Sequence, residues 1–241
     1  MDNEWMCRIR VISFDGDDTL WDFGRVMRHS LKHALEELRV HVPGARSADL
    51  TIDEMIAIRD RLAGAERCAG VRLEEVRRLA FEETLVSIGV RDPALAGHLN
   101  AVYLKHRFGD IELYDDVLPA FDALAKRFQL GLLTNGNTYP KCCGLEAFFQ
   151  FAVFAQDHGF EKPDPRLFHV ALQEANCLGG DMLHVGDSLR ADVAGAQNAG
   201  VKSVWLNRDR ARMTGACRPD LEIARLTELI ALLPDAEKDR E

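Results

Sequence analysis

Three carboxylates crowd into four positions of the segment FDGDDTL, directly behind an apolar run. Asp15, Asp17 and Asp18 repel one another unless a cation or a proton separates them. Residues two apart in an extended segment point to the same side, so Asp15 and Asp17 can act on one ligand. One carboxylate can attack a substrate atom while the other transfers a proton. We assign Asp15 as the candidate nucleophile and Asp17 as the candidate general acid and base.

Further polar side chains follow other apolar runs of the chain. Thr134 and Asn135 stand at the end of the run QLGLLT and just beyond it, and Asp187 follows MLHVG, with Asp192 five residues later. Lys162 lies in EKPDP, just ahead of a predicted helix start. Ligands of an open parallel sheet bind outside the carboxyl ends of its strands, so we expect these groups to share one edge.

The chemistry of this set predicts a site for a metal ion and a phosphoryl group together. Oxygen ligands without a histidine cluster favour Mg²⁺ over zinc, with Asp15 and Asp187 as side-chain ligands and Asp17 as a backbone carbonyl ligand. The hydroxyl of Thr134, the N–H groups that follow it from Asn135 onward, and the charge of Lys162 fit phosphoryl oxygens. Asp15, Asp17 and Asp187 are therefore the candidate metal ligands.

Apolar runs separated by helical patterns indicate the elements that position these groups. The runs at 8–14, 129–134, 151–155, 181–186 and 201–206 are typical of buried strands. Helical patterns lie between them, including one that begins at Asp164 as N-cap with Pro165 in the first turn. The alternation predicts an α/β fold, a doubly wound parallel sheet of five or six strands.

Residues 22–112 interrupt that alternation with several helical patterns and no convincing strand. One helix is expected to start at the capping box TIDE, residues 51–54. We therefore expect two domains, in which residues 1–21 and 113–241 form the α/β core and residues 22–112 form an inserted all-helical cap.

Four segments together resemble a known family. FDGDDTL, LLTNG, EKPDP and VGDSLRAD are similar, in order and spacing, to the four motifs of the haloacid dehalogenase-like superfamily. The likeness is to its phosphatases that carry a helical cap after the first motif, and it extends from residue 8 to about residue 207. The resemblance implies a Rossmann-like core and a Mg²⁺-dependent enzyme that passes through a phosphoaspartate.

The resemblance also implies a role for each matching residue. The family's nucleophile and its acid/base match Asp15 and Asp17, and its phosphate-binding threonine and lysine match Thr134 and Lys162. Its magnesium carboxylate matches Asp187. The expected activity is hydrolysis of a small phosphate monoester.

Two positions near these residues need separate mention. Asp192 matches a second acidic position of the family, which supports either the water shell of the metal or Lys162. The first motif departs from the usual Asp-hydrophobic-Asp-Gly-Thr, because this chain has Gly16 and Asp18 at the intervening positions. Neither change removes a chemical group that the mechanism needs, and Asp18 has no assigned role.

Composition limits the classes of partner. The 241 residues carry a formal net charge of -9 with dispersed Lys and Arg, which argues against a nucleic acid polymer or an anionic membrane as partner. No stretch approaches the roughly 18 apolar residues of a membrane span, and the start lacks a signal peptide, so we expect a cytoplasmic protein. The expected partner is a small phosphorylated metabolite, and the sequence carries no signal for an oligomeric state.

Three alternatives use a similar set of groups. A sugar-phosphate mutase would differ only in retaining the phosphoryl group. A 2-haloacid dehalogenase would attack carbon through Asp15, with no need of Mg²⁺ or of an acid for the departing halide, so Asp17 and Asp187 argue against it. A phospho-accepting signalling domain would form a long-lived phosphoaspartate. The acid/base at Asp17 and the helical insertion argue against this alternative.

Several residues outside the four segments have simpler explanations. His29 and His33, four apart on a predicted helix, are two potential metal ligands, and two make no site, so we expect a solvated helix face. We expect His184 to be a hydrogen-bonded core histidine. Trp21 is expected to serve packing next to the first motif.

Overall fold

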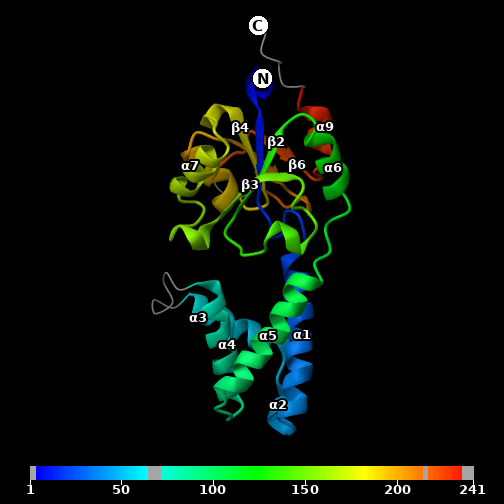
Figure 1. Ribbon diagram of the computed structural model, residues 1–241, viewed down its shortest axis with the longest axis vertical. Coiled ribbons are helices and arrows are strands. Elements are labelled where there is room, and N and C mark those ends of the chain that lie inside the picture. Colours follow the sequence, from blue (N-terminus) through cyan, green and yellow to red (C-terminus); the bar gives the residue numbers. More distant parts are fainter. Residues whose placement is uncertain (1–3, 65–71, 214–216, 235–241) are drawn as a thin grey trace. The chain divides into compact units, whose positions relative to one another are not determined.

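The computed structural model describes residues 4–64, 72–213 and 217–234, and the chain forms two compact units (Figure 1). The core unit comprises Met1–Asp22 together with Leu113–Glu241, and the helical unit comprises Phe23–Glu112. The helical unit thus interrupts the core unit between its first strand and the rest of its sheet.

A parallel sheet of six strands forms the centre of the core unit. Its order is β3-β2-β1-β4-β5-β6, and every neighbouring pair is parallel. The strands are β1 Val11–Phe14, β2 Gln129–Thr134, β3 Phe149–Phe154, β4 Met182–Gly186, β5 Lys202–Leu206 and β6 Leu221–Ile223. The predicted doubly wound parallel α/β fold is confirmed. The sixth strand, β6, is a three-residue edge strand that lacks the apolar run by which the other five were recognised.

Helices cover both faces of this sheet, with α7 on one side and α6 and α9 on the other (Figure 1). The helices are α6 Val117–Leu124, α7 Pro165–Glu174, α8 Gly195–Asn198 and α9 Glu228–Leu232, with a π-helical segment at Leu189–Ala194 and 3₁₀ turns at Glu4–Arg8, Pro140–Cys142, Ala155–Asp157 and Gly179–Asp181. Because both faces are covered, all four residues of β1 are buried. The sheet therefore offers ligands access only at its strand ends.

The predicted start of α7 is confirmed in detail. The side chain of Asp164 accepts a hydrogen bond from the backbone N–H of Arg166 at 2.9 Å, and Pro165 occupies the first turn. Leu167, Phe168 and Ala171 then pack on the sheet. Asp164 is thus a helix cap, which places it outside the candidate catalytic set.

Among its described residues the helical unit contains five helices and no strand. They are α1 Phe23–His41, α2 Ala45–Asp49, α3 Ile52–Ala63, α4 Leu73–Ser87 and α5 Pro93–Gly109. The predicted capping box is present at the start of α3, where Thr51 and Glu54 satisfy each other's backbone N–H groups. Helices α1 and α5 lie side by side and contribute most of the apolar core of the unit (Figure 1).

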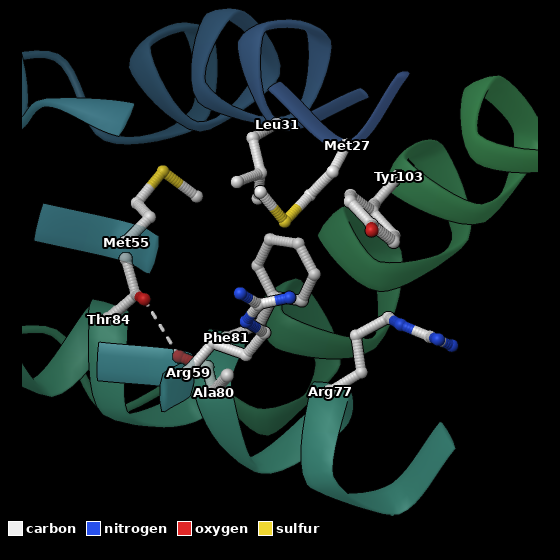
Figure 2. Close-up of a pocket in the computed structure, with 9 residues that line it drawn as sticks. All are labelled: Met27, Leu31, Met55, Arg59, Arg77, Ala80, Phe81, Thr84 and Tyr103. Atoms are coloured by element: carbon white, nitrogen blue, oxygen red, sulfur yellow. Dashed lines mark hydrogen bonds between the residues drawn. The ribbon is translucent and has the colours of Figure 1, made fainter. Parts of the chain in front are cut away.

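A small cavity lies inside the helical unit, between Met27 of α1, Phe81 of α4 and Tyr103 of α5 (Figure 2). Its volume is about 30 Å³, which is room for a water molecule or two and far below the roughly 300 Å³ of a typical metabolite pocket. The interior of the helical unit is therefore a packed core. None of the helices within the described residues has the length and apolar content needed to cross a membrane.

Candidate active site

Three neighbouring strands end at the same edge of the sheet and bring distant carboxylates together. Phe14 of β1 pairs with Leu132 of β2 and with Val185 of β4, so the residues that follow these strands become neighbours. Carboxylate oxygens of Asp15, Asp187 and Asp192 all lie within 4.8 Å of one another. The structure thus places these three predicted site residues in one cluster.

Lys162 lies at the centre of this cluster. Its ammonium group donates to Oδ1 of Asp15 at 2.6 Å, to Oδ1 of Asp192 at 2.6 Å and to the carbonyl oxygen of Leu133 at 2.8 Å. The residue is only 3% exposed, and its three N–H donors are all used. An ammonium so deeply buried requires charged partners, and Asp15 and Asp192 provide them.

Asn135 holds the backbone of Lys162 in place. Its Oδ1 accepts from the backbone N–H of Lys162 at 2.8 Å, and its Nδ2 donates to the carbonyl oxygen of Lys162 at 3.0 Å. Both polar ends of the amide are therefore engaged. For phosphate binding, Asn135 is expected to offer only its backbone N–H. Its side chain positions Lys162, a role that the sequence did not reveal.

Asp192 is held by a chain of buried groups that starts on β1. The hydroxyl of Ser13 lies 2.9 Å from Nδ1 of His184, and Nε2 of His184 lies 3.1 Å from Oδ1 of Asp192. Burial lowers the pKa of His184, so the ring is neutral, with Nε2–H donating to the carboxylate and Nδ1 accepting from Ser13. His184 is thus hydrogen-bonded in the core as expected, and it also orients Asp192. Asp192 was expected to support either the water shell of the metal or Lys162, and in the structure it contacts Lys162.

The charges of this cluster do not balance. Burial raises the pKa of Asp15, against the opposing effect of Lys162, and burial raises the pKa of Asp187 to about 6. For Asp192 burial acts in the same direction, but the charge of Lys162 and the hydrogen bond from His184 outweigh it and lower the pKa. Three carboxylates against one ammonium leave an excess of negative charge, which favours the uptake of a cation or a proton.

Asp17 is fixed by a residue that the sequence analysis assigned to packing. The indole N–H of Trp21 donates to Oδ1 of Asp17 at 2.7 Å. On the other side, a Cβ added to Gly136 would lie 2.8 Å from Oδ2 of Asp17, so this carboxylate needs a glycine there. Thr134, the predicted phosphate ligand, accepts the N–H of Gly136 at 2.9 Å through its hydroxyl oxygen. The hydroxyl hydrogen of Thr134 points away from this bond and is free to donate a hydrogen bond to a ligand.

Asp18, which had no assigned role, adopts a left-handed backbone conformation with φ of 62°. Its N–H donates to the carbonyl oxygen of Trp21 at 2.8 Å, which closes the turn after Asp17. Glycine adopts this conformation without cost, and aspartate is among the few other residues that tolerate it. Asp18 therefore replaces the usual glycine of the first motif at a position whose left-handed backbone favours glycine and tolerates aspartate.

A pocket of about 440 Å³ opens beside Asp187 within the core unit. Its walls include Asp18, Tyr114 and Arg208, and the guanidinium of Arg208 lies 4.0 Å from the centre of the Tyr114 ring. Asp116 fixes Arg208 through two hydrogen bonds of 3.0 Å. The volume is within the range of small-molecule sites, so the cluster borders a space that can receive a small substrate.

Comparison with known proteins gives one family over most of the chain. The sequence profile of the haloacid dehalogenase-like hydrolases matches residues 9–200. The 5-amino-6-(5-phospho-D-ribitylamino)uracil phosphatase YigB of Escherichia coli is 29% identical, over 94% of this chain and 97% of that protein.

Two solved structures resemble the whole chain. A 2-haloacid dehalogenase from Pseudomonas syringae pv. Tomato DC3000 has a TM-score of 0.80 and 32% identity, and the likeness covers 93% of this chain and 98% of that one. The putative hydrolase YfnB from Bacillus subtilis, whose crystal structure contains magnesium, has a TM-score of 0.72 and 27% identity, with coverage of 94% and 99%. The family profile spans well over half of the chain and agrees with the sheet and with the four segments, so the protein belongs to the haloacid dehalogenase-like hydrolases.

Proposed function

We propose that this hydrolase is a Mg²⁺-dependent phosphatase of a small phosphate monoester, with a phosphoaspartate at Asp15 as intermediate. One observation carries the proposal: Asp15 is hydrogen-bonded to Lys162 in a buried cluster that also contains Asp187 and Asp192 and has excess negative charge. The phosphatase activity named for the E. coli relative supports it.

The chain's own groups suffice for the covalent steps. A carboxylate oxygen of Asp15 attacks phosphorus, the bond from phosphorus to the ester oxygen breaks, and Asp17 donates its proton to that leaving oxygen. Asp17 then takes a proton from water, the water oxygen attacks phosphorus, and the bond to Asp15 breaks to release inorganic phosphate. Trp21 holds Asp17 in place through both steps by its indole N–H.

Binding of the phosphoryl group falls to residues at the end of β2 and to Lys162. The hydroxyl of Thr134 and the N–H groups that follow it are the neutral donors. Lys162 lies against the attacking carboxylate, so its charge is in place to offset the charge of the phosphoryl oxygens. Because Asn135 and Asp192 fix the lysine at both ends, little reorganisation is needed when the substrate binds.

The residues present fit a magnesium ion. The cluster offers carboxylate oxygens, and burial raises the pKa values of Asp15 and Asp187 even though Lys162 opposes the effect, so a further positive charge would be stabilised there. Asp15 and Asp187 would hold the ion through their side chains and Asp17 through its backbone carbonyl. When bound, the ion supplies positive charge to the phosphoryl oxygens. The magnesium in the B. subtilis structure supports this assignment.

The helical unit fits the role of a cap. Closure of a cap over an active site excludes water during the first step and restricts which leaving groups can enter. The division of the chain at residues 22 and 113 gives this unit two connections to the core unit, one of them directly after the first motif.

A dehalogenase is the second candidate, because the P. syringae neighbour with 32% identity is described as a 2-haloacid dehalogenase. A halide leaves carbon without a proton and without a metal, so a dehalogenase has no use for the acid at Asp17 or the carboxylate at Asp187. In this chain Asp187 lies in the carboxylate cluster with Asp15, and the side chain of Asp17 is hydrogen-bonded by Trp21. The chemistry of the site therefore favours a phosphatase.

A paired assay distinguishes these candidates. Inorganic phosphate release from an aryl phosphate, with Mg²⁺ and with a chelator, is compared with chloride release from 2-chloropropionate. We expect Mg²⁺-dependent phosphate release and no halide release; metal-independent chloride release would assign a dehalogenase. A screen of sugar phosphates with product analysis would reveal a mutase, which would return an isomeric sugar phosphate in place of inorganic phosphate.

A further inference from the structure

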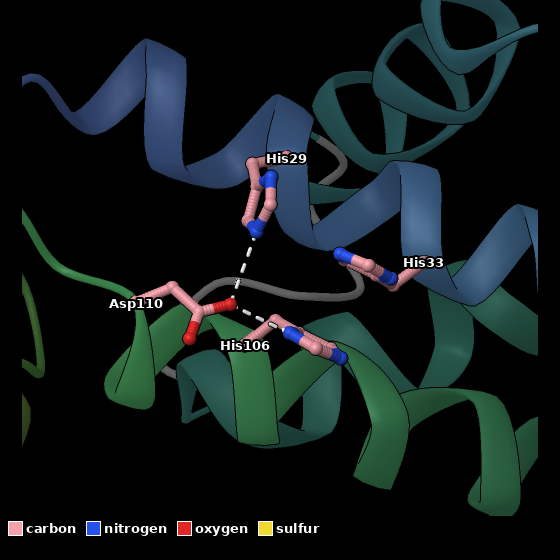
Figure 3. A group of neighbouring side chains, drawn as sticks. All are labelled: His29, His33, His106 and Asp110. Carbon is pink, nitrogen blue, oxygen red and sulfur yellow. Dashed lines mark hydrogen bonds and ion pairs between the residues drawn. The ribbon is translucent and has the colours of Figure 1, made fainter.

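Two helices of the helical unit bring three imidazoles and a carboxylate together on its surface (Figure 3). His29 and His33 lie one turn apart on α1, and His106 and Asp110 lie one turn apart on α5 and at its end. Side chains four residues apart share a helix face, so each helix presents a pair of potential metal ligands to the other. One potential ligand atom from each residue lies within 4.8 Å of the other three.

The contacts within this cluster, the His29–His33–His106–Asp110 cluster, converge on one point. Nε2 of His29 donates to Oδ2 of Asp110 at 3.0 Å, and Nδ1 of His106 donates to the same oxygen at 2.6 Å. Nitrogens from two different helices therefore face a single oxygen (Figure 3). The ring of His33 stacks on that of His106 with centroids 3.8 Å apart.

We propose that the His29–His33–His106–Asp110 cluster is a site for a zinc-like transition metal ion, separate from the magnesium site of the core unit. Three imidazole nitrogens and one carboxylate oxygen make four ligands, the number that tetrahedral zinc takes. Imidazole suits zinc and its neighbours, whereas Mg²⁺ prefers oxygen ligands throughout, so the two sites select different metals.

The dimensions agree with this assignment. Tetrahedral zinc with ligands at 2.0–2.1 Å holds its ligand atoms about 3.3 Å apart. The distances between the four ligand atoms, now up to 4.8 Å, would need to shorten by about 1.5 Å at most. The side chains of His29 and Asp110 are 45% and 41% exposed, so they can turn without repacking the core.

The position of the cluster gives the metal a structural consequence. His29 lies in the first half of α1, which begins directly after the core unit, and His33 lies near the middle of that helix. His106 and Asp110 lie at the end of α5, just before the chain returns to the core unit. A bound ion would join α1 to the end of α5 near these two connections. Binding to the folded form alone raises stability by mass action.

A zinc titration of the full chain without a histidine tag tests the proposal. Isothermal calorimetry with saturating Mg²⁺ present is expected to show one zinc site in the wild type, and zinc is expected to raise the melting temperature. His29→Ala and His106→Ala are each expected to weaken zinc binding at least about tenfold, because each removes a ligand. Co²⁺ in place of zinc is expected to give the visible absorption of a four-coordinate site, and His106→Ala is expected to abolish it.

Two control variants locate the binding. His98 also lies on α5, where it contacts Glu37 at 2.9 Å in a separate group with His41, and His98→Ala should leave the main zinc affinity unchanged. Asp187→Asn alters the core site and should also leave it unchanged. The proposal is wrong if the wild type shows no zinc binding, if His29→Ala and His106→Ala bind as the wild type does, or if only Asp187→Asn or His98→Ala loses the ion. Unaltered helical circular dichroism in the variants excludes unfolding as the cause.

Discussion

The two clusters of ionisable groups in this protein use burial in opposite ways. In the core unit the side chains of Lys162 and Asp192 are 1% and 2% exposed, and three carboxylates share one ammonium. In the helical unit the His29–His33–His106–Asp110 cluster stands at the surface, where solvent screens its charges. Burial is what shifts the protonation of the core cluster, whereas the surface cluster depends on the convergence of its ligand atoms.

The difference extends to what holds each cluster in place. Core residues are fixed by individual hydrogen bonds. Trp21 donates to Asp17 within the segment after β1, Asn135 donates to the carbonyl oxygen of Lys162, and His184 contacts Asp192. The surface cluster is fixed by the spacing of residues on two packed helices. We therefore expect substitutions in the core unit to have large effects on activity or stability and charge substitutions on the helical unit to have small ones.

The largest expected effect follows Asp15→Asn, which removes the nucleophile. We expect kcat for an aryl phosphate to fall by about 10⁴-fold or more, because the carboxylate that forms the covalent intermediate is lost. The matched control is Asp115→Asn, which makes the same change on a carboxylate that is 78% exposed and should keep activity. Activity of Asp15→Asn above a small fraction of the wild-type value would refute the assignment.

Asp17→Asn is expected to lower kcat by about 10² to 10⁴-fold, because proton transfer to the leaving oxygen is lost. Calorimetry should show Mg²⁺ affinity close to the wild-type value, since the proposed metal contact of Asp17 is its backbone carbonyl. A large loss of Mg²⁺ affinity would instead make the side chain a metal ligand.

Lys162→Met tests the buried ion cluster through stability. Removal of the ammonium leaves Asp15 and Asp192 buried without their partner, and breaking a buried pair in this way costs about 3–5 kcal/mol. Urea unfolding measures the loss. The control is Lys202→Met, which breaks a half-buried pair with Asp220 and should cost clearly less; equal losses would mean that burial is not decisive.

Asp187→Asn is expected to stabilise the metal-free protein, with a dependence on pH. Burial raises the pKa of Asp187 from 3.8 to about 6, so the stability contributed by its protonated form is fully present below pH 3.8 and is lost as the pH rises through about 6. Asparagine stays neutral, so the free energy of unfolding of the variant is expected to exceed that of the wild type by about 3 kcal/mol above pH 7 and by roughly half of that at pH 5. Unfolding with a chelator at both pH values measures the gain; a variant less stable at pH 7.5 would contradict it.

The smallest expected effect is that of Arg28→Ala on the helical unit. Arg28 and Asp53 form an ion pair at 2.7 Å, but their side chains are 50% and 76% exposed. Exposed pairs of this kind contribute at most about 1 kcal/mol. Thermal unfolding should give a melting temperature within a few degrees of the wild type, and a larger loss would show that surface charge on this unit matters as much as buried charge in the core.

The sequence allowed the sheet and much of the site to be predicted, for one physical reason. Buried parallel strands need continuous apolar runs, and polar residues directly behind such runs must lie at the ligand-binding edge. Asp15 and Asp187 were found in this way, and Lys162 was found by its place in EKPDP, just ahead of a predicted helix start; the three do meet in one cluster. Asp18 also follows an apolar run, but no role could be predicted for it. Its left-handed backbone, with φ of 62°, is indicated in the sequence only by the glycine that the family usually has at this position.

What only the tertiary structure decided are contacts between side chains from different elements. Nothing in the chain near Asn135 marks its bond to the backbone of Lys162, and nothing near His184 marks its contact with Asp192. His29 and His33 are only two potential metal ligands, which is too few to predict a site from the sequence. His106 and Asp110 come close to them only because α5 packs beside α1. A sequence fixes which groups follow a strand or share a helix face, since those depend on local geometry. The partners that such groups meet depend on how whole elements pack, and that is determined by the fold.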